Sequence, residues 1–167
     1  GLSLVPQGSR CFIRMTVEDN LVMGSYPKAA RAKVKDSLER VYELFPVLKE
    51  KRNDLSGSLS GGQRQGGALL MATMTPLKFL ILDEHTAALD PKTAEVIMAL
   101  TDRVIREKHL TAMMVTHNLR YAVEYGDRIL MMNRGRVVLD RAGAEKRATS
   151  MDDILTMFNQ ISLETGN

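Results

Sequence analysis

The sequence is poor in several residue types that define whole classes of protein. It has one cysteine in 167 residues, so an internal disulfide is excluded and a reducing compartment is favoured. It has no tryptophan, and its densest apolar run, Phe79–Leu82, is far shorter than the ~20 residues that a membrane span needs. The first residues lack the basic-then-apolar pattern of a secretion signal. The net charge of +3 comes from interspersed charges, which argues against a nucleic-acid-binding surface.

What the sequence does contain is an ordinary globular composition, with 44% hydrophobic and 26% charged residues, in a chain long enough for one domain. The apolar runs at 79–83 and 110–115 are typical of buried parallel strands, and residues 2–5 indicate the end of another strand. Asp90 is predicted to cap a helix that has Pro91 at its first position. Residues 127–140 predict a hairpin. Because helical spacing separates the apolar runs, we expect an α/β fold with a parallel central sheet.

Residues 16–57 predict an all-helical insertion. Thr16 has the position of an N-cap, and Asp19 stands three residues later to complete a capping box. Lys28–Phe45 has the apolar spacing of a single amphipathic helix. Pro46 is expected to end that helix, since proline cannot continue it.

The stretch "SLSGGQRQ" (58–65) combines a strong helix start with two costly residues. Ser60 and Gln63 form an S-x-x-Q capping box, which predicts that a helix begins directly after Ser60. Gly61 and Gly62 each cost roughly 1 kcal/mol relative to alanine inside a helix. We therefore expect another interaction to offset the two glycines.

Polar residues stand where each predicted parallel strand ends. Gln7 follows the first strand, Asp83 and Glu84 end the second, and His117 follows the third. Because the carboxyl ends of parallel strands face one crevice, this set suits metal-dependent phosphoryl transfer. Taken singly, His117 and Gln7 have a plainer interpretation as structural residues. The acidic pair Asp83 and Glu84 could likewise begin an exposed loop. Their order and spacing together favour the site.

With the glycine-rich stretch, these residues make the sequence resemble the nucleotide-binding subunit of ATP-binding-cassette (ABC) transporters. Its five motifs, in family order, are similar to the Q-loop, the ABC signature, the Walker B strand, the D-loop and the switch-histidine segment: "LVPQ" (Leu4–Gln7), "LSGGQ" (Leu59–Gln63), "FLILDE" (Phe79–Glu84), "AALD" (Ala87–Asp90) and "VTHN" (Val115–Asn118). A lone SGGQ would be a weak signal. Five motifs run from residue 1 to about the hairpin and imply a P-loop NTPase-like parallel sheet with an inserted helical subdomain.

The resemblance implies ATP and Mg²⁺ as cofactors and gives each residue a role. Asp83 serves Mg²⁺, and Gln7 senses the metal or its water. Glu84 polarises the attacking water, His117 contacts the γ-phosphate, and Asp90 belongs to the D-loop of a dimer.

The signature helix of the family points its N-terminus at ATP held by the opposite subunit. Glycines let backbone N–H groups approach an anion without a Cβ in the way, and the helix dipole favours negative charge. The resemblance thus implies nucleotide binding in trans by Ser60, Gly61, Gly62 and Gln63. This binding would offset the helical cost of the two glycines.

The sequence also departs from the family pattern. The phosphate-binding loop G-x-x-x-x-G-K-[ST] is absent, and no Gly-Lys pair occurs in the 167 residues. We therefore expect a C-terminal fragment or an engineered truncation, inactive alone. His85 stands where the family usually has proline, and Gly66 and Gly67 replace better helix formers. The first part resembles branched-chain amino-acid uptake ATPases and the later part another importer subfamily, so a mosaic origin stays open.

Four segments are expected: 1–15 as the Q-loop end of the core, 16–57 as the helical subdomain, 58–149 as the signature helix and ATPase core, and 150–167 as the C-terminal helix. The expected function is ATP binding and hydrolysis as the energy-coupling subunit of an importer for amino acids or similar small molecules. Such a subunit is cytoplasmic and peripheral at the inner face of the plasma membrane. Its partners would be a second ATPase subunit and transmembrane permease subunits, with no nucleic acid.

Two other functions stay open. One is a non-transport ABC protein acting on DNA or ribosomes, although such relatives usually carry coiled-coil insertions, tandem cassettes or basic arms that this sequence lacks. The other is a non-catalytic binding or assembly module. Under any of these functions, unpaired strand edges predict that the chain alone is dimeric or prone to aggregate.

Overall fold

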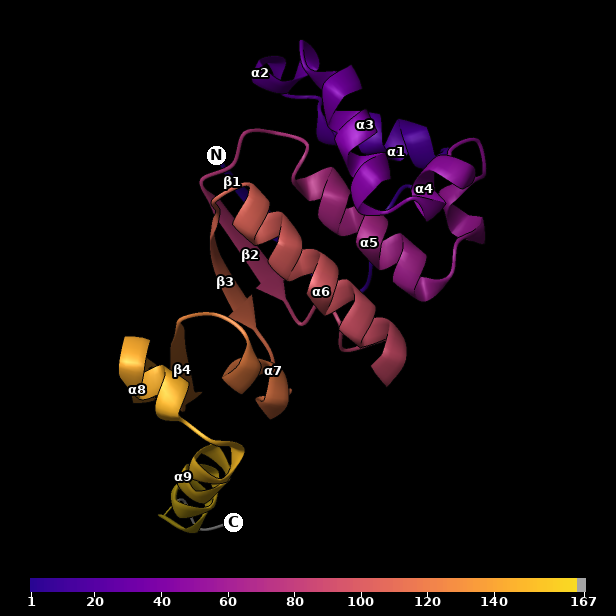
Figure 1. Ribbon diagram of the computed structural model, residues 1–167. Helices are drawn as coiled ribbons and strands as arrows, with labels where there is room; N and C mark the ends of the chain where they lie inside the picture. The colour runs from indigo at the N-terminus through magenta and orange to yellow at the C-terminus, as the bar shows by residue number, and fades with distance from the viewer. Residues whose placement is uncertain (165–167) are drawn as a thin grey trace. The chain divides into compact units, whose positions relative to one another are not determined.

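The computed structural model describes residues 1–164, which form two compact units, 1–115 and 116 onward (Figure 1). The boundary between the units falls inside the expected segment 58–149. The elements, in chain order, are β1 (Leu2–Val5), α1 (Val17–Gly24), α2 (Lys28–Arg31), α3 (Val34–Leu44), α4 (Val47–Glu50), η1 (Ser56–Ser58), α5 (Gly61–Ala72), β2 (Phe79–Asp83), α6 (Pro91–Glu107), β3 (Thr111–Val115), α7 (Leu119–Glu124), β4 (Arg128–Asn133), β5 (Arg136–Ala142), α8 (Gly143–Ala148) and α9 (Met151–Glu164).

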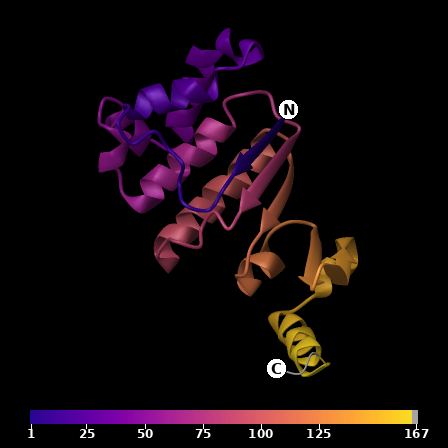
Figure 2. The ribbon, with the colours of Figure 1, turned by 180° about the vertical axis from the view of Figure 1, so that it is seen from behind.

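The first unit is built on a parallel sheet in the order β1-β2-β3, which confirms the predicted α/β fold. One face of the sheet packs against α5 and α6, and its residues Val5, Leu80 and Leu82 belong to the main hydrophobic core. Figures 1 and 2, which view the sheet from its two sides, show α6 on one face and the bare strands on the other.

The uncovered face of the sheet is apolar as well. Side chains alternate between the faces of a strand, so Leu2, Leu4, Ile81, Met113 and Val115 lie opposite the core. Four of them are exposed, and Ile81 is partly exposed. The apolar runs predict burial on both faces, and the structure buries only one of them.

The helical segment departs from the sequence prediction at one point. The single helix predicted over Lys28–Phe45 is wrong, because the chain forms α2 and α3 with a break at Ala32–Lys33. Local contacts tie α2 to the turn before it, since Arg31 stacks on the Tyr26 ring and its Nε donates to the Tyr26 carbonyl oxygen (2.7 Å). The buried Ala30 and Val41 lie about three helical turns apart, so the apolar spacing conceals the break.

The second unit contains the predicted hairpin, in which β4 and β5 pair antiparallel. Arg134 and Gly135 both have positive φ (48° and 76°), as a two-residue hairpin turn requires. Ile129, Leu139 and Ile154 form a separate small core there. The short helix α8 is missing from the sequence prediction. Within residues 1–164, none of the helices combines the length and the apolar composition that crossing a bilayer requires.

Candidate functional site

Three predicted site residues lie at the carboxyl edge of the parallel sheet. Val5 pairs with Leu82, so Gln7 leaves β1 at the same end of the sheet at which β2 closes with Asp83 and Glu84. Gln7 and Asp83 are exposed, and Glu84 is half-buried. The structure thus places an amide and two carboxylates at the edge where open parallel sheets bind ligands.

The backbone of Glu84 has an unusual conformation. Its φ is 44°, in the left-handed region that residues other than glycine rarely occupy. Two hydrogen bonds hold it there: the Glu84 N–H donates to the Val115 carbonyl oxygen of β3, and the Ala87 N–H donates to the Glu84 carbonyl oxygen (both 3.0 Å). The turn after β2 is therefore fixed by the end of its neighbouring strand.

His85 is buried beside this turn, with only 3% of its surface exposed. Its Nε2 lies 3.1 Å from Thr101 Oγ1 in α6, and the Thr101 hydroxyl donates to the Ile97 carbonyl oxygen (2.7 Å). Since that hydroxyl has one proton to donate, Thr101 Oγ1 accepts from the His85 Nε2–H. Burial lowers the pKa of His85 to about 4, so the ring is neutral near pH 7 and links the turn to α6.

Asp90 closes the same loop by capping α6. Its Oδ1 accepts from the Thr93 N–H (3.1 Å), and Pro91 takes the first helical position, as the sequence predicts. The hydrogen bonds from Thr93 lower the pKa of the Asp90 carboxyl group. The capping role is confirmed, and the proposed D-loop role of Asp90 stays a prediction.

The signature segment begins α5 with the predicted capping box. Ser60 Oγ accepts from the Gln63 N–H (3.2 Å), and Gln63 Oε1 accepts from the Ser60 N–H (3.0 Å). Gly61 is exposed at the helix start. An added Cβ on it would meet only Leu89, at 3.7 Å, so Gly61 is not required by packing.

Two of the three neighbouring glycines have a packing role that the sequence does not reveal. A Cβ on Gly62 would clash with Thr93 Cγ2 of α6, and a Cβ on Gly66 would lie 2.5 Å from the Phe45 ring. A Cβ on Gly67 would reach Leu48 only at 4.0 Å, an ordinary contact. Close helix packing therefore explains Gly62 and Gly66, and leaves Gly61 as the glycine best explained by ligand approach. Nothing in the structure explains Gly67.

Comparison with known proteins identifies the family. Residues 1–87 match the family model described as "ABC transporter", which is 87 of the 167 residues. The chain belongs to the ABC transporter family. A solved structure of cbiO1 from Clostridium perfringens, part of the ABC transporter complex cbiONQ, matches with a TM-score of 0.77 at 24% identity, over 99% of this chain and 65% of that one. This likeness confirms the ABC fold.

Two curated relatives are more similar to this chain in sequence than that solved structure is. A tyrosine transport ATP-binding protein of Clostridioides difficile is 43% identical over 152 residues, and the high-affinity branched-chain amino acid transport ATP-binding protein BraG of Pseudomonas aeruginosa is 35% identical over 143 residues. Each alignment covers 86% of this chain and 60% of the relative. The chain thus spans about three fifths of the length of these ABC proteins.

The fourth predicted residue of the ABC site, His117, lies in the second unit. It is exposed in the short connection between β3 and α7. The next residue, Asn118, caps α7 by accepting from the Tyr121 N–H (3.3 Å), and its own N–H donates to Thr116 Oγ1 (3.0 Å). His117 thus sits in a defined turn, and its contact with the γ-phosphate stays a prediction.

The oxygen atoms at the sheet edge fit Mg²⁺ bound together with a nucleotide. Among the described residues, no group of three or more His, Cys, Asp and Glu side chains is arranged to hold a metal ion. Mg²⁺ in nucleotide sites usually needs fewer protein ligands, since it keeps several waters and is bound by one or two carboxylates and the phosphates. Asp83 and Gln7 offer oxygen ligands of this kind, and their part in holding Mg²⁺ stays a prediction.

Proposed function

We propose that the chain is the part of an ABC importer ATPase that acts on the nucleotide. The observation that carries the proposal is the pairing of an acidic sheet edge with a glycine-opened helix start in one unit. Leu89, in the loop that follows Glu84, lies beside Gly61 at the N-terminus of α5. The catalytic carboxylate and the signature are thus parts of one packed structure.

The residues at the sheet edge divide the chemistry. Bound Mg²⁺–ATP supplies the phosphoryl group and a cation to neutralise its charge. Asp83 would hold the metal through water, Gln7 would contact the metal or that water, and Glu84 would polarise the attacking water. His117 would contact the γ-phosphate. The two backbone hydrogen bonds of Glu84 fix the position of the main chain from which its side chain extends.

The signature segment serves a second subunit. The N–H groups at the start of α5 and the helix dipole favour an anion, and Gly61 leaves its approach open. Ser60, Gly61, Gly62 and Gln63 bind the nucleotide held by the partner, and Asp90 lies in the loop that meets it. A second ABC ATPase subunit is therefore required for turnover.

The proposed substrate class comes from the relatives, and the proposed membrane partner from exposed apolar residues. The two relatives named above are described as transport proteins for tyrosine and for branched-chain amino acids, so we propose an amino acid or a similar small molecule. Phe12, Ile13 and Leu55 are exposed apolar residues in and beside the segment after Gln7. We propose that a permease subunit docks on this segment and that the protein works at the cytoplasmic face of the membrane.

The test uses ATP hydrolysis with and without a phosphate-binding loop. The chain is assayed alone and with an added polypeptide that contains a G-x-x-x-x-G-K-[ST] loop. We expect hydrolysis only in the mixture, and a loss of at least 10²-fold with Glu84→Gln, the magnitude typical of a lost general base. Glu95→Gln, which removes an exposed carboxylate from α6, is the matched control.

The outcomes separate the competing functions. If the mixture hydrolyses no ATP with either the original chain or the Glu84→Gln variant, the non-catalytic binding module is favoured. Full activity of the Glu84→Gln mixture would overturn the assigned base. Gly61→Ala should lower hydrolysis and leave the melting temperature intact, because its methyl group fits beside Leu89.

A further inference from the structure

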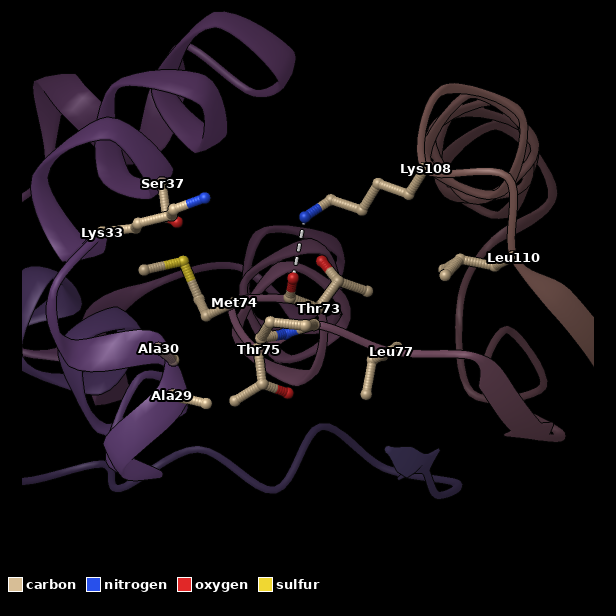
Figure 3. Close-up of a pocket in the computed structure, with 11 residues that line it drawn as sticks. Ala29, Ala30, Lys33, Ser37, Thr73, Met74, Thr75, Leu77, Lys108 and Leu110 are labelled. Atoms are coloured by element: carbon tan, nitrogen blue, oxygen red, sulfur yellow. Dashed lines mark hydrogen bonds between the residues drawn. The ribbon is translucent and has the colours of Figure 1, made fainter.

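A cavity of about 290 Å³ lies in the first unit, on the side of the helical segment (Figure 3). Its walls come from α2 and α3, from the connection between α5 and β2, and from the end of α6. The lining residues are Ala29, Ala30, Lys33, Ser37, Thr73, Met74, Thr75, Pro76, Leu77, Lys108 and Leu110. The cavity uses none of the residues assigned to the ATP site, and its volume is near the lower end of the range for small-molecule pockets.

The charge lining the cavity has one sign. Lys33 and Lys108 approach it from opposite walls, and no acidic residue is among the eleven that line it (Figure 3). Lys108 Nζ donates one hydrogen bond to the Thr73 carbonyl oxygen (2.8 Å) at the end of α5. An ammonium group has three N–H donors, so this bond leaves others for a ligand.

The surroundings of Lys108 make a bound anion favourable. Burial lowers the pKa of Lys108, and the charge of Arg40 lowers it further. Glu107 opposes this effect, but its carboxylate is shared by Arg40 (2.5 Å) and Arg103 (2.9 Å). An anion in the cavity would supply a negative charge opposite the Lys108 ammonium group.

The remaining walls define the rest of the ligand. Met74, Leu77 and Leu110 are apolar, and Ala29 and Ala30 add methyl groups. Ser37 and Thr75 contribute hydroxyl groups to the lining. The chemistry of the walls fits a molecule with one anionic end and a short apolar body.

We propose that this cavity binds a small organic anion, a carboxylate or a phosphate, between Lys33 and Lys108. The anionic end lies between the two ammonium groups, and the apolar body contacts Met74, Leu77 and Leu110. Such a ligand joins the helical segment 28–44 to the end of α6. The site is independent of nucleotide binding.

The test measures binding of defined probes without nucleotide. Isovalerate and inorganic phosphate are titrated by calorimetry, and the methyl signals of Met74 and Leu110 are followed by NMR. Isovaleramide, which has the same shape and no charge, is the control ligand. We expect isovalerate, phosphate or both to bind and shift these signals, and isovaleramide to have no effect.

Variants locate the site. Lys33→Gln leaves the hydrogen bond between Lys108 and Thr73 in place and should weaken anion binding at least tenfold. The double variant that adds Lys108→Gln should abolish anion binding. Lys35→Gln, on α3 but outside the cavity, should bind as the original chain does. Circular dichroism melts verify that each variant is folded.

Three results would overturn the proposal: no binding of either anion, equal effects of isovalerate and isovaleramide, or unchanged affinity in folded Lys33→Gln. Because no ATP is present, these results do not depend on whether the chain hydrolyses it. Failure of the ATP site would leave this proposal standing, and the reverse also holds.

Discussion

The two faces of the three-stranded sheet have similar sequences and different surroundings. On the covered face, Val5, Leu80 and Leu82 are at most 1% exposed beneath the helices. On the open face, Leu2 is 65% exposed and Met113 is 47% exposed. The alternation of the strands distributes leucine, isoleucine, valine and methionine to both faces.

The difference shows what an apolar strand pattern can and cannot indicate. A continuous apolar run predicts that a strand is suited to burial on both sides. Which side is buried depends on where helices from elsewhere in the chain pack, as α5 and α6 do here. The contribution of each apolar residue to the free energy of unfolding therefore depends more on its face of the sheet than on its residue type. Substitutions on the two faces can measure this difference.

Neighbouring residues of β2 give the largest expected contrast. Leu82→Ala on the covered face should cost about 2–5 kcal/mol of unfolding free energy, because it leaves a cavity in the core. Ile81→Ala on the open face should cost less, about 1–2 kcal/mol, because this side chain is partly exposed and its loss leaves no enclosed cavity. Urea titrations of both variants measure the difference. Equal costs would mean that the faces are energetically alike.

The second prediction concerns His85, which is buried against α6. Its pKa is about 4 in the folded chain and near the ordinary 6.5 when unfolded, so at intermediate pH the unfolded chain binds more protons. Unfolding free energy should therefore fall as the pH drops from about 7 to about 4, by on the order of 3 kcal/mol. Urea unfolding at several pH values, without Mg²⁺, measures this loss.

The matched variant for this prediction is His85→Gln, which keeps a polar side chain and cannot titrate. The carboxylates that also titrate in this range are present in both proteins, so the difference between the two curves reports His85. Parallel curves for the two proteins would show that burial of this ring does not control the acid sensitivity.

The third prediction uses adjacent glycines of α5, the helix on the covered face. Gly66→Ala should destabilise the chain by about 1–3 kcal/mol, because its methyl group meets the Phe45 ring. Gly67→Ala should stabilise it by about 1 kcal/mol through helix propensity, since only Leu48 is near. Thermal melts measure both effects. Adding Phe45→Leu to Gly66→Ala should recover part of the loss, and no recovery would contradict the assigned clash.

The smallest effect on stability is expected on the open face itself. Met113→Lys should change unfolding free energy by no more than about 0.5 kcal/mol, as for other exposed positions. It should nevertheless reduce self-association, because it places a charge on an exposed apolar surface beside a strand edge. Sedimentation velocity over a concentration series tests this. A parent chain that is monomeric at every concentration would refute the predicted association.

Features predicted correctly from sequence depend on short-range interactions. The caps Thr16, Ser60 and Asp90 each bond to a backbone N–H three residues later, so the whole interaction lies within one short stretch. The parallel strands and the hairpin likewise carry their signals in their own residues. The acidic sheet edge follows from the strand ends, although the catalytic roles there stay predictions.

Features that the sequence did not reveal depend on contacts between distant residues. Phe45 meets Gly66, and Lys33 faces Lys108 across the cavity, with no local pattern to indicate either pair. His85 stands where the family usually has proline, and only its contact with Thr101 in α6 shows why a polar ring is accommodated. The break before α3 preserves the helical period and is for that reason invisible in the sequence.

The left-handed backbone of Glu84 has a consequence for how this position can change. Glycine adopts such a φ at almost no cost, whereas glutamate loses roughly 1 kcal/mol there. Thermodynamic stability alone would therefore favour glycine at residue 84. A carboxylate at this point is compatible with the fold and is not favoured by it, so stability does not account for its presence.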